Sequence, residues 1–230
     1  MTNGQGVRAV LRAGRLLIVL VAWAGGSNAA FAREQPIHVA SIAEARRLPL
    51  GTLVTIEGEV STPSGAFESS FFDKGFGVED CGAGLFVSLQ TDLGVLPRTH
   101  VRVKGVLQDS YGLLLLVPAD VADVKVHGRG PKVIARPEAT GAINEDTEGQ
   151  IVEVAGTITE APSSDLPYGY KFAVDDGSGP ISIFVNLQTG IDVTTLAVGQ
   201  KVRVTGFSSQ FDTHYEIDPR GPQDIIVRRR

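Results

Sequence analysis

The chain has 230 residues and a formal net charge of −5 at pH 7. That charge excludes the overall basic field of a non-specific nucleic-acid binder, although a local basic surface remains allowed. The single cysteine, Cys81, excludes an internal disulfide, so the fold has to depend on its hydrophobic cores.

The first 32 residues have the pattern of a secretory signal peptide. A basic start precedes an apolar run of about nine residues, too short for the roughly 20 that span a bilayer, which disfavours the alternative of an uncleaved anchor helix. The arginines are Arg8, Arg12 and Arg15, the run covers residues 16–24, and Ala30-Phe31-Ala32 offers a cleavage site. Removing this segment changes the formal charge to −8. We therefore expect a periplasmic or secreted protein that does not span the membrane.

The rest of the chain contains an internal sequence repeat. Four segments recur in the same order, at offsets of 98, 96, 98 and 101 residues. They are 51–60 with 149–158, 78–80 with 174–176, 89–91 with 187–189, and 101–105 with 202–206. This indicates a duplicated domain of about a hundred residues. We expect a first domain at 33–127, a linker at 128–148 and a second domain at 149–230.

Each copy predicts five short strands, because apolar and polar residues alternate with a period of two, as in Val54, Ile56 and Val60. The expected strands lie within 51–60, 72–79, 85–89, 100–107 and 113–117, and within 149–158, 170–175, 181–187, 201–207 and 214–217. A short lead-in helix is expected at 42–48. Glycine-rich segments at 80–84 and 176–180 predict hairpin turns. Gly58 and Gly156 predict a bend in each first strand. The fold class is all-β, with two tandem five-stranded Greek-key barrels.

The second copy also carries the motifs Gly-x-x-Val-x-Val-x-Gly-x-Ile, Val-Asp-Asp-Gly-Ser-Gly-Pro-Ile-x-Ile-Phe-Val and Val-Arg-Val-Thr-Gly-Phe. These resemble the bacterial OB-fold families, including the nucleic-acid-binding anticodon type. The resemblance implies OB-type barrels that bind ligands on strands two and three, between the loops that follow strands one and four. The motifs are turns and bends, so they support the fold more than any ligand.

Seven residues are candidates for binding. Phe86 and Phe184 hold equivalent positions in the outward phase of the third strands, where an OB barrel would stack a base or a sugar. The alternative is that each packs under a loop, against the lead-in helix or against the other barrel. The remaining candidates are Phe67 and Tyr168 in loops, and the basic residues Arg102, Arg203 and Lys171. The basic residues could hold phosphate or an acidic partner, or could belong to a solvated surface of mixed charge. We expect Phe72, with Phe76, Tyr170 and Phe172, to lie in the cores.

Catalysis finds little support in the sequence. The four histidines are scattered without metal-ligand spacing, and Cys81 lies in an expected turn without a histidine partner. We therefore predict no catalytic residue, no metal site and no cofactor.

Three functions remain open. The first is an exported non-catalytic binding module whose ligand is single-stranded nucleic acid, a glycan or a protein segment. The second is a structural or assembly protein of the cell envelope that binds a partner chain, and the third is an enzyme acting on phosphodiesters. Burial of Phe86 and Phe184 between the barrels would favour the second function, whereas exposure of both in one groove would favour stacking.

Overall fold

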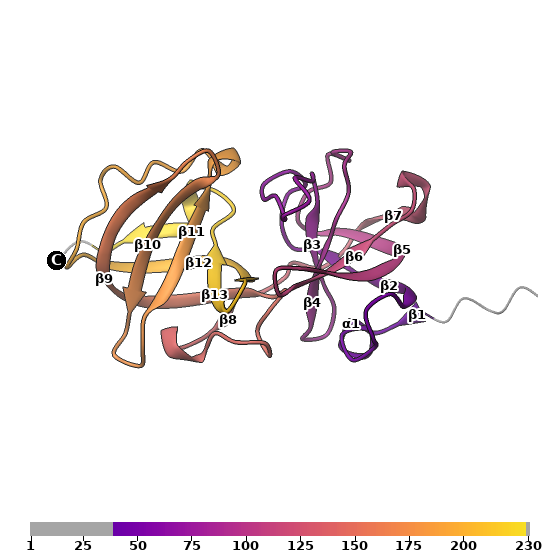
Figure 1. Cartoon of the computed structure of the whole chain (residues 1–230), viewed down its shortest axis with the longest axis horizontal. Coiled ribbons are helices and arrows are strands. Elements are labelled where there is room, and N and C mark those ends of the chain that lie inside the picture. Colours follow the sequence, from indigo (N-terminus) through magenta and orange to yellow (C-terminus); the bar gives the residue numbers. More distant parts are fainter. Residues whose placement is uncertain (1–38, 229–230) are drawn as a thin grey trace, which may run out of the picture. The chain divides into compact units, whose positions relative to one another are not determined.

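The computed structural model describes residues 39–228, so the predicted signal peptide lies outside the described part. Two sheets of the same design form this part, and each closes into a five-stranded barrel (Figure 1). The predicted all-β class with OB-type barrels is therefore confirmed. No helix between residues 39 and 228 is long and apolar enough to cross a membrane.

The first barrel runs in the order β2-β3-β4-β6-β5 and closes through pairing of β2 with β5. Its strands are β2 (Leu53–Val60), β3 (Phe76–Glu79), β4 (Gly84–Val87), β5 (Thr99–Ser110) and β6 (Leu113–Val117). Strands β4 and β6 pair in parallel, whereas the other neighbours are antiparallel. Strand β2 pairs with β5 along most of its length and with β3 at its end. It takes up the second partner near Gly58, where a Cβ would lie 2.5 Å from the Glu79 carbonyl oxygen.

The second barrel repeats this order as β9-β10-β11-β13-β12, closed through β9 and β12. Its strands are β9 (Ile151–Asp165), β10 (Gly169–Asp175), β11 (Ile181–Asn186), β12 (Lys201–Phe211) and β13 (His214–Asp218). Strand β9 is longer than predicted. Pro162 to Asp165, expected to be part of a loop, continue the strand because Ser163 and Asp165 pair with β10.

The duplication extends to the elements that enter and leave each barrel. Before each barrel, a two-residue strand pairs in parallel with the first strand, and a short helical turn follows it. After each fifth strand, a 3-10 turn leads to a last strand that pairs with the fourth. In the first copy these are β1 (Val39–Ala40), α1 (Ile42–Ala45), η1 (Val121–Asp123) and β7 (Val124–Arg129). In the second they are β8 (Arg136–Pro137), η2 (Thr140–Ala142), η4 (Pro222–Asp224) and β14 (Ile225–Val227), with η3 (Leu187–Thr189) after β11. The segment 128–148 thus contains β8 and η2.

The recurring aspartates of the hairpin turns have a structural role. Asp80 Oδ2 accepts a hydrogen bond from the Ile42 amide at 2.7 Å, and Asp176 Oδ2 accepts one from the Thr140 amide at 3.2 Å. Each carboxylate thereby satisfies a free amide at the start of the lead-in turn of its own barrel. Cys81, next to Asp80, is an exposed free thiol between β3 and β4.

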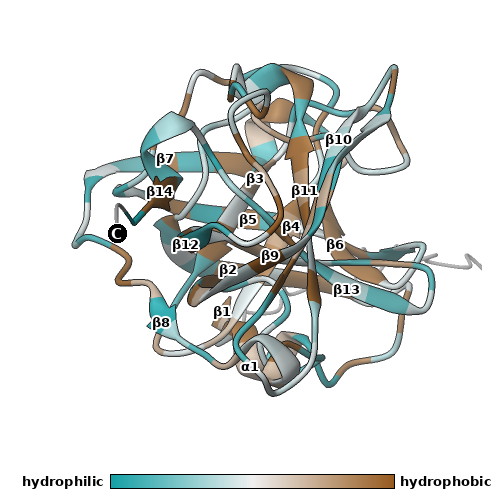
Figure 2. Cartoon of the chain, turned by 90° about the vertical axis from the view of Figure 1, so that its left-hand side faces the viewer, coloured by the Kyte–Doolittle hydropathy of each residue, from teal (hydrophilic) through white to brown (hydrophobic). Residues whose placement is uncertain are grey.

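Each barrel encloses its own apolar core, built from the inward phase of its strands. Ile56, Phe76 and Leu85 are fully buried in the first barrel, as are Val174 and Ile183 in the second. Figure 2 shows the apolar colour on β11, whereas β8 and β13 carry hydrophilic colour. Phe76 and Phe172 are core residues, as predicted, and Tyr170 packs against the second core while partly buried.

A third apolar cluster joins the two barrels, and we call it the inter-barrel cluster. It consists of Ala66, Phe67, Phe86, Leu113 and Leu115 from the first barrel and Ile151 and Phe207 from the second. The Phe207 ring centroid lies 5.9 Å from that of Phe86 and 6.0 Å from that of Phe67. This interlocking of aromatic rings excludes water from the outer surface of β4.

Polar contacts surround the inter-barrel cluster. Glu79 Oε1 accepts a hydrogen bond from the Ile151 amide at 2.7 Å, and the Arg220 guanidinium donates to the Ser61 carbonyl at 3.2 Å. Arg46 forms an ion pair with the buried Glu148 at 3.1 Å. The two barrels also approach through backbone, because a Cβ on Gly84 would lie 2.0 Å from the Gly149 carbonyl oxygen.

Candidate binding surface

The loops after the first strands bring exposed aromatic rings from both barrels together. Phe72 precedes β3 and is 62% exposed, and Tyr168 lies in the β9–β10 turn and is 52% exposed. Their ring centroids are 6.3 Å apart. The expectation that Phe72 is a core residue in a strand is wrong, because its backbone has a φ of +52° and β3 begins only at Phe76.

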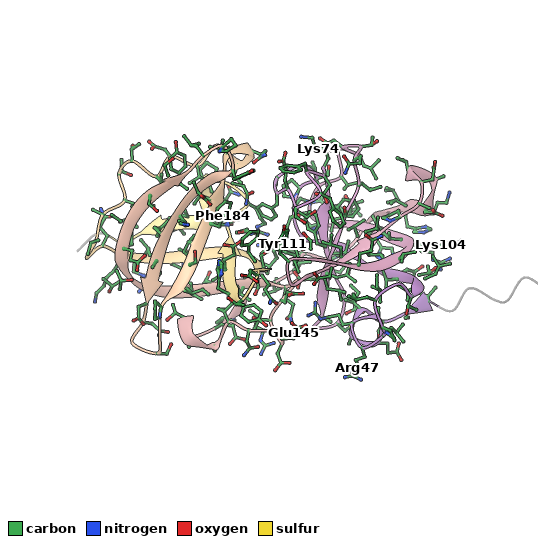
Figure 3. The ribbon with its side chains drawn as sticks, in the orientation of Figure 1. Arg47, Lys74, Lys104, Tyr111, Glu145 and Phe184 are labelled. Carbon is green, nitrogen blue, oxygen red and sulfur yellow. The ribbon has the colours of Figure 1, made fainter. Side chains whose placement is uncertain are left out.

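The turns after the fourth strands form a second aromatic contact between the barrels. The rings of Tyr111 and Phe211 stack with centroids 5.3 Å apart, and both side chains remain at least half exposed. The Asp212 amide donates to the Tyr111 carbonyl at 2.6 Å, and the His214 ring lies 5.9 Å from Phe211. Figure 3 shows Tyr111 at the tip of the β5–β6 turn, where it reaches the second barrel. Equivalent loops of the two copies therefore meet each other.

The outer surface of the second barrel carries Phe184 on β11, flanked by charged groups. Lys171 on β10 is the cross-strand neighbour of Phe184, and Glu216 on β13 is the neighbour of Ser182. Because alternate residues of a strand share a side, Asp218 lies on the same side of the sheet as Glu216 and in line with Phe184. Lys171 is exposed, Phe184 and Glu216 are half-buried, and Asp218 is buried. We call the whole set the candidate surface; its members are Phe72, Tyr111, Tyr168, Lys171, Phe184, Phe211, Glu216 and Asp218.

The two carboxyl groups of this set have perturbed acidity. Burial raises the pKa of Glu216 to about 7, with Asp165 adding to the effect and Lys171 opposing it. Burial also raises the pKa of Asp218 well above its ordinary value, and the neighbouring Glu216 charge raises it further. Asp218 is 6% exposed, and its Oδ1 has no hydrogen-bond partner. Within the described part, no group of three or more His, Cys, Asp or Glu side chains could hold a metal ion.

Phe86 and Phe184, the paired aromatic candidates, have different environments. Phe86 is 2% exposed inside the inter-barrel cluster, so it packs against the other barrel, which is one of the environments that the sequence leaves open, and it is not available for stacking with a ligand. Phe67, expected in an exposed loop, is 3% exposed for the same reason. Phe184 and Tyr168 do lie at the molecular surface.

The predicted basic residues divide in a similar way. Arg102 pairs with Glu57, and Arg203 lies 3.8 Å from Glu153, each on the part of its strand that joins the first strand of the same barrel. Neither arginine borders Phe184, and the expected solvated surface of mixed charge describes them well. Lys171 is the one predicted basic residue that belongs to the candidate surface.

Three of the exposed aromatic rings are not among the residues that the sequence predicts for the site. The sequence pattern predicts a core strand position for Phe72 and no role for Tyr111 or Phe211. A usable signal was present, since both copies carry an aromatic residue next to the turn between the fourth and fifth strands. Such loop residues carry binding more often than framework does.

Two shallow depressions lie away from the candidate surface. One, of about 470 Å³, is bordered by Thr157, Lys201 and Arg228 of the second barrel. The other, of about 390 Å³, is bordered by Gln90 and Asp120 of the first barrel. Neither contains a residue of the candidate surface.

Comparison with known proteins gives similarity at the level of structure. No family model matches the chain, and no curated protein matches its sequence. An OBody bound to hen egg-white lysozyme is 19% identical, with a TM-score of 0.34, over 44% of this chain and 97% of that one. A murine DNA-binding protein bound with double-stranded DNA is 14% identical, with a TM-score of 0.41, over 76% and 97%. A replication protein A heterotrimer bound to single-stranded DNA is 18% identical, with a TM-score of 0.29, over 35% and 58%. These similarities are too distant to place a ligand on this chain.

Proposed function

We propose that this chain is an exported, non-catalytic binding module that holds a linear ligand along the candidate surface. The observation that carries the proposal is the position of the exposed aromatic rings. They come from the equivalent loops of both barrels, and these loops flank the one strand surface that carries Phe184. In OB folds the ligand surface is bordered by the same two loops.

The dimensions of the candidate surface suit a short extended ligand. Strands rise by roughly 3.3 Å per residue, so the five residues of β13 and the six of β11 separate the two loop contacts by roughly 15–20 Å. This is the length of about five or six residues of an extended peptide. Aromatic rings at both ends and Phe184 between them would provide successive contacts along such a chain.

Burial of Phe86 supports one shared surface rather than two independent barrel sites. Phe207 of the second barrel covers the outer surface of β4 in the first barrel. The first barrel contributes Phe72 and Tyr111, from its loops, to the candidate surface. This arrangement also favours the second candidate function, an envelope assembly protein, because a barrel pair fixed in this way could hold a partner chain.

Binding can be tested by titrating the ¹⁵N-labelled chain with three probes: a twelve-residue oligothymidine, a soluble oligosaccharide and a mixed pool of hexapeptides. We expect one probe to shift the amide signals of Tyr168, Phe184 and Phe211. The double variant Tyr168→Ser, Phe211→Ser should lose this response, whereas Leu50→Ser, an exposed residue elsewhere on the first barrel, should keep it. Shifts confined to the depression at Thr157, or no response to any probe, would overturn the proposal.

Export is the second part of the proposal and can be tested independently. The basic, apolar and small-residue order of residues 1–32 supports cleavage after Ala32. N-terminal sequencing of the protein from the periplasmic or culture fraction should then begin at Arg33. Protein that begins at Met1 and stays with the cytoplasm would contradict export while leaving the binding surface unaffected.

A further inference from the structure

The charges around the candidate surface are mainly acidic. Lys171 is the cation beside Phe184, and its charge and that of Asp165 both act on Glu216. The charge of Glu216 acts in turn on Asp218. At the other end, Asp109 and Asp212 lie at the exposed turns beside Tyr111 and Phe211, with His214 as the neighbouring titratable group. Lys74 lies in the loop that leads to β3, and its Nζ is 3.5 Å from Glu68 Oε1, so the glutamate balances its positive charge. The local charge, like the charge of the whole chain, therefore opposes a polyphosphate ligand.

Asp218 adds an observation of a different kind. Its side chain is more than nine-tenths buried, yet Oδ1 has no hydrogen-bond donor within the described residues. Leaving a buried carboxyl oxygen without a partner costs free energy that a donor from a ligand would recover. The register places Asp218 on the side of the sheet that carries Phe184 and Glu216. The acid pair at 216 and 218 therefore has one carboxyl oxygen that lacks a donor.

We propose that the candidate surface binds a protein segment through an arginine or lysine side chain, which stacks on Phe184 and donates to the Glu216–Asp218 pair. This inference rests on the proposed binding function and names its ligand class. A cation over an aromatic ring and a charge-assisted hydrogen bond to a carboxylate are both favourable, and they require the two residue types found here side by side. Lys171 on the other flank suits the carbonyl groups or an acidic side chain of the same segment.

The test uses two synthetic hexapeptides that differ at one position. Acetyl-Gly-Thr-Arg-Thr-Gly-Thr-amide carries arginine, and its partner carries citrulline, which keeps the shape and removes the charge. Titrated into the ¹⁵N-labelled full chain at low salt, the arginine peptide should shift the amides of Lys171, Phe184 and Glu216. It should bind about tenfold more tightly than the citrulline peptide, the effect of one good charged pair.

Variants connect that preference to the acid pair. Glu216→Gln and Asp218→Asn should each reduce the arginine preference to about twofold or less, since each replaces a carboxyl group that can accept a charge-assisted hydrogen bond from the bound guanidinium. Asp123→Asn, which removes an acidic group from η1 of the first barrel, should leave the preference unchanged. If one of these two carboxyl variants destabilises the barrel, the other still tests the inference.

The outcomes separate this inference from the function on which it rests. Equal binding of the two peptides, or an arginine preference that Asp123→Asn reduces as much as Glu216→Gln does, would overturn it. Binding of oligothymidine at Tyr168 and Phe184, without binding of the arginine peptide, would overturn the ligand class and leave the binding module intact. Absence of any response on the candidate surface would remove both.

Discussion

Two phenylalanines at equivalent positions of the repeat, Phe86 and Phe184, have different environments. Phe207 pairs with Asp218 in the second barrel at the place where Val106 pairs with Val117 in the first. The large Phe207 ring packs against Phe86, whereas Phe184 stays half-buried on the outer surface of the second barrel. One barrel therefore loses its open surface and the other retains it.

The burial of Phe207 predicts its effect on stability. Phe207→Ala should lower the free energy of unfolding by about 3–5 kcal/mol, because the ring is 1% exposed and touches both Phe67 and Phe86. Phe211→Ala is the matched control, since this ring is 50% exposed, and its cost should be about 1 kcal/mol or less. Denaturant unfolding measures both. Equal costs would contradict the inter-barrel cluster.

The buried Glu79 predicts a pH dependence. Burial raises its pKa from the ordinary 4.5 to about 7, although the Ile151 amide and Arg220 oppose the rise. The folded chain therefore holds this proton more tightly than the unfolded chain does. The resulting stability is fully present below about pH 4.5 and is lost as the pH rises through about 7.

Glu79→Gln removes this titration while its amide oxygen can still accept from the Ile151 amide. The free energy of unfolding of the variant relative to the parent should be higher at pH 8 than at pH 5 by about 1–3 kcal/mol. Glu160→Gln, on the exposed part of β9, should give the same difference at both pH values. A flat difference for Glu79→Gln would show that the carboxyl group is not buried as described.

At the scale of the elements, the sequence predicted the strands well where alternation and turn residues agreed. The fifth strand at 113–117 is observed at those residues, and the recurring Gly58 and Gly156 mark the bend of the first strands. The prediction of a strand at Phe72 is wrong, because the residue has a loop conformation. The prediction of a loop at 162–165 is also wrong, because residues 163–165 pair with β10. Outward-pointing residues could be identified from their phase. Which of them stay exposed depends on contacts made by residues a hundred positions away.

The close backbone approach of β4 to the start of the second barrel predicts another sensitive position. Gly84→Ala should lower the free energy of unfolding by about 1–3 kcal/mol, because its Cβ would lie 2.0 Å from the Gly149 carbonyl oxygen. Cys81→Ala, in the exposed turn that precedes β4, should have little effect. If Gly84→Ala were as stable as Cys81→Ala in thermal unfolding, the two backbones could not be in contact.

For the whole molecule, the repeat in the sequence predicts two similar barrels, and the structure has them. The packing of one barrel on the other could not be derived, because it depends on which outward residues of two similar surfaces fit together. That packing buries Phe67 and Phe86, whereas Tyr168, Lys171 and Phe184 remain on the candidate surface. The remaining two predicted site residues, Arg102 and Arg203, lie beside glutamates of their own barrels. The binding function therefore depends on the asymmetry between two copies of one fold.

The rate at which a thiol reagent labels cysteines placed at the two equivalent positions tests this asymmetry most directly. In a Cys81→Ser background, which removes the one exposed native thiol, Phe184→Cys should react rapidly and Phe86→Cys slowly. In denaturant, the labelling rate of Phe86→Cys should rise until it equals that of Phe184→Cys. Rapid labelling of both positions in the native protein would contradict the inter-barrel packing, and with it the single binding surface derived from it.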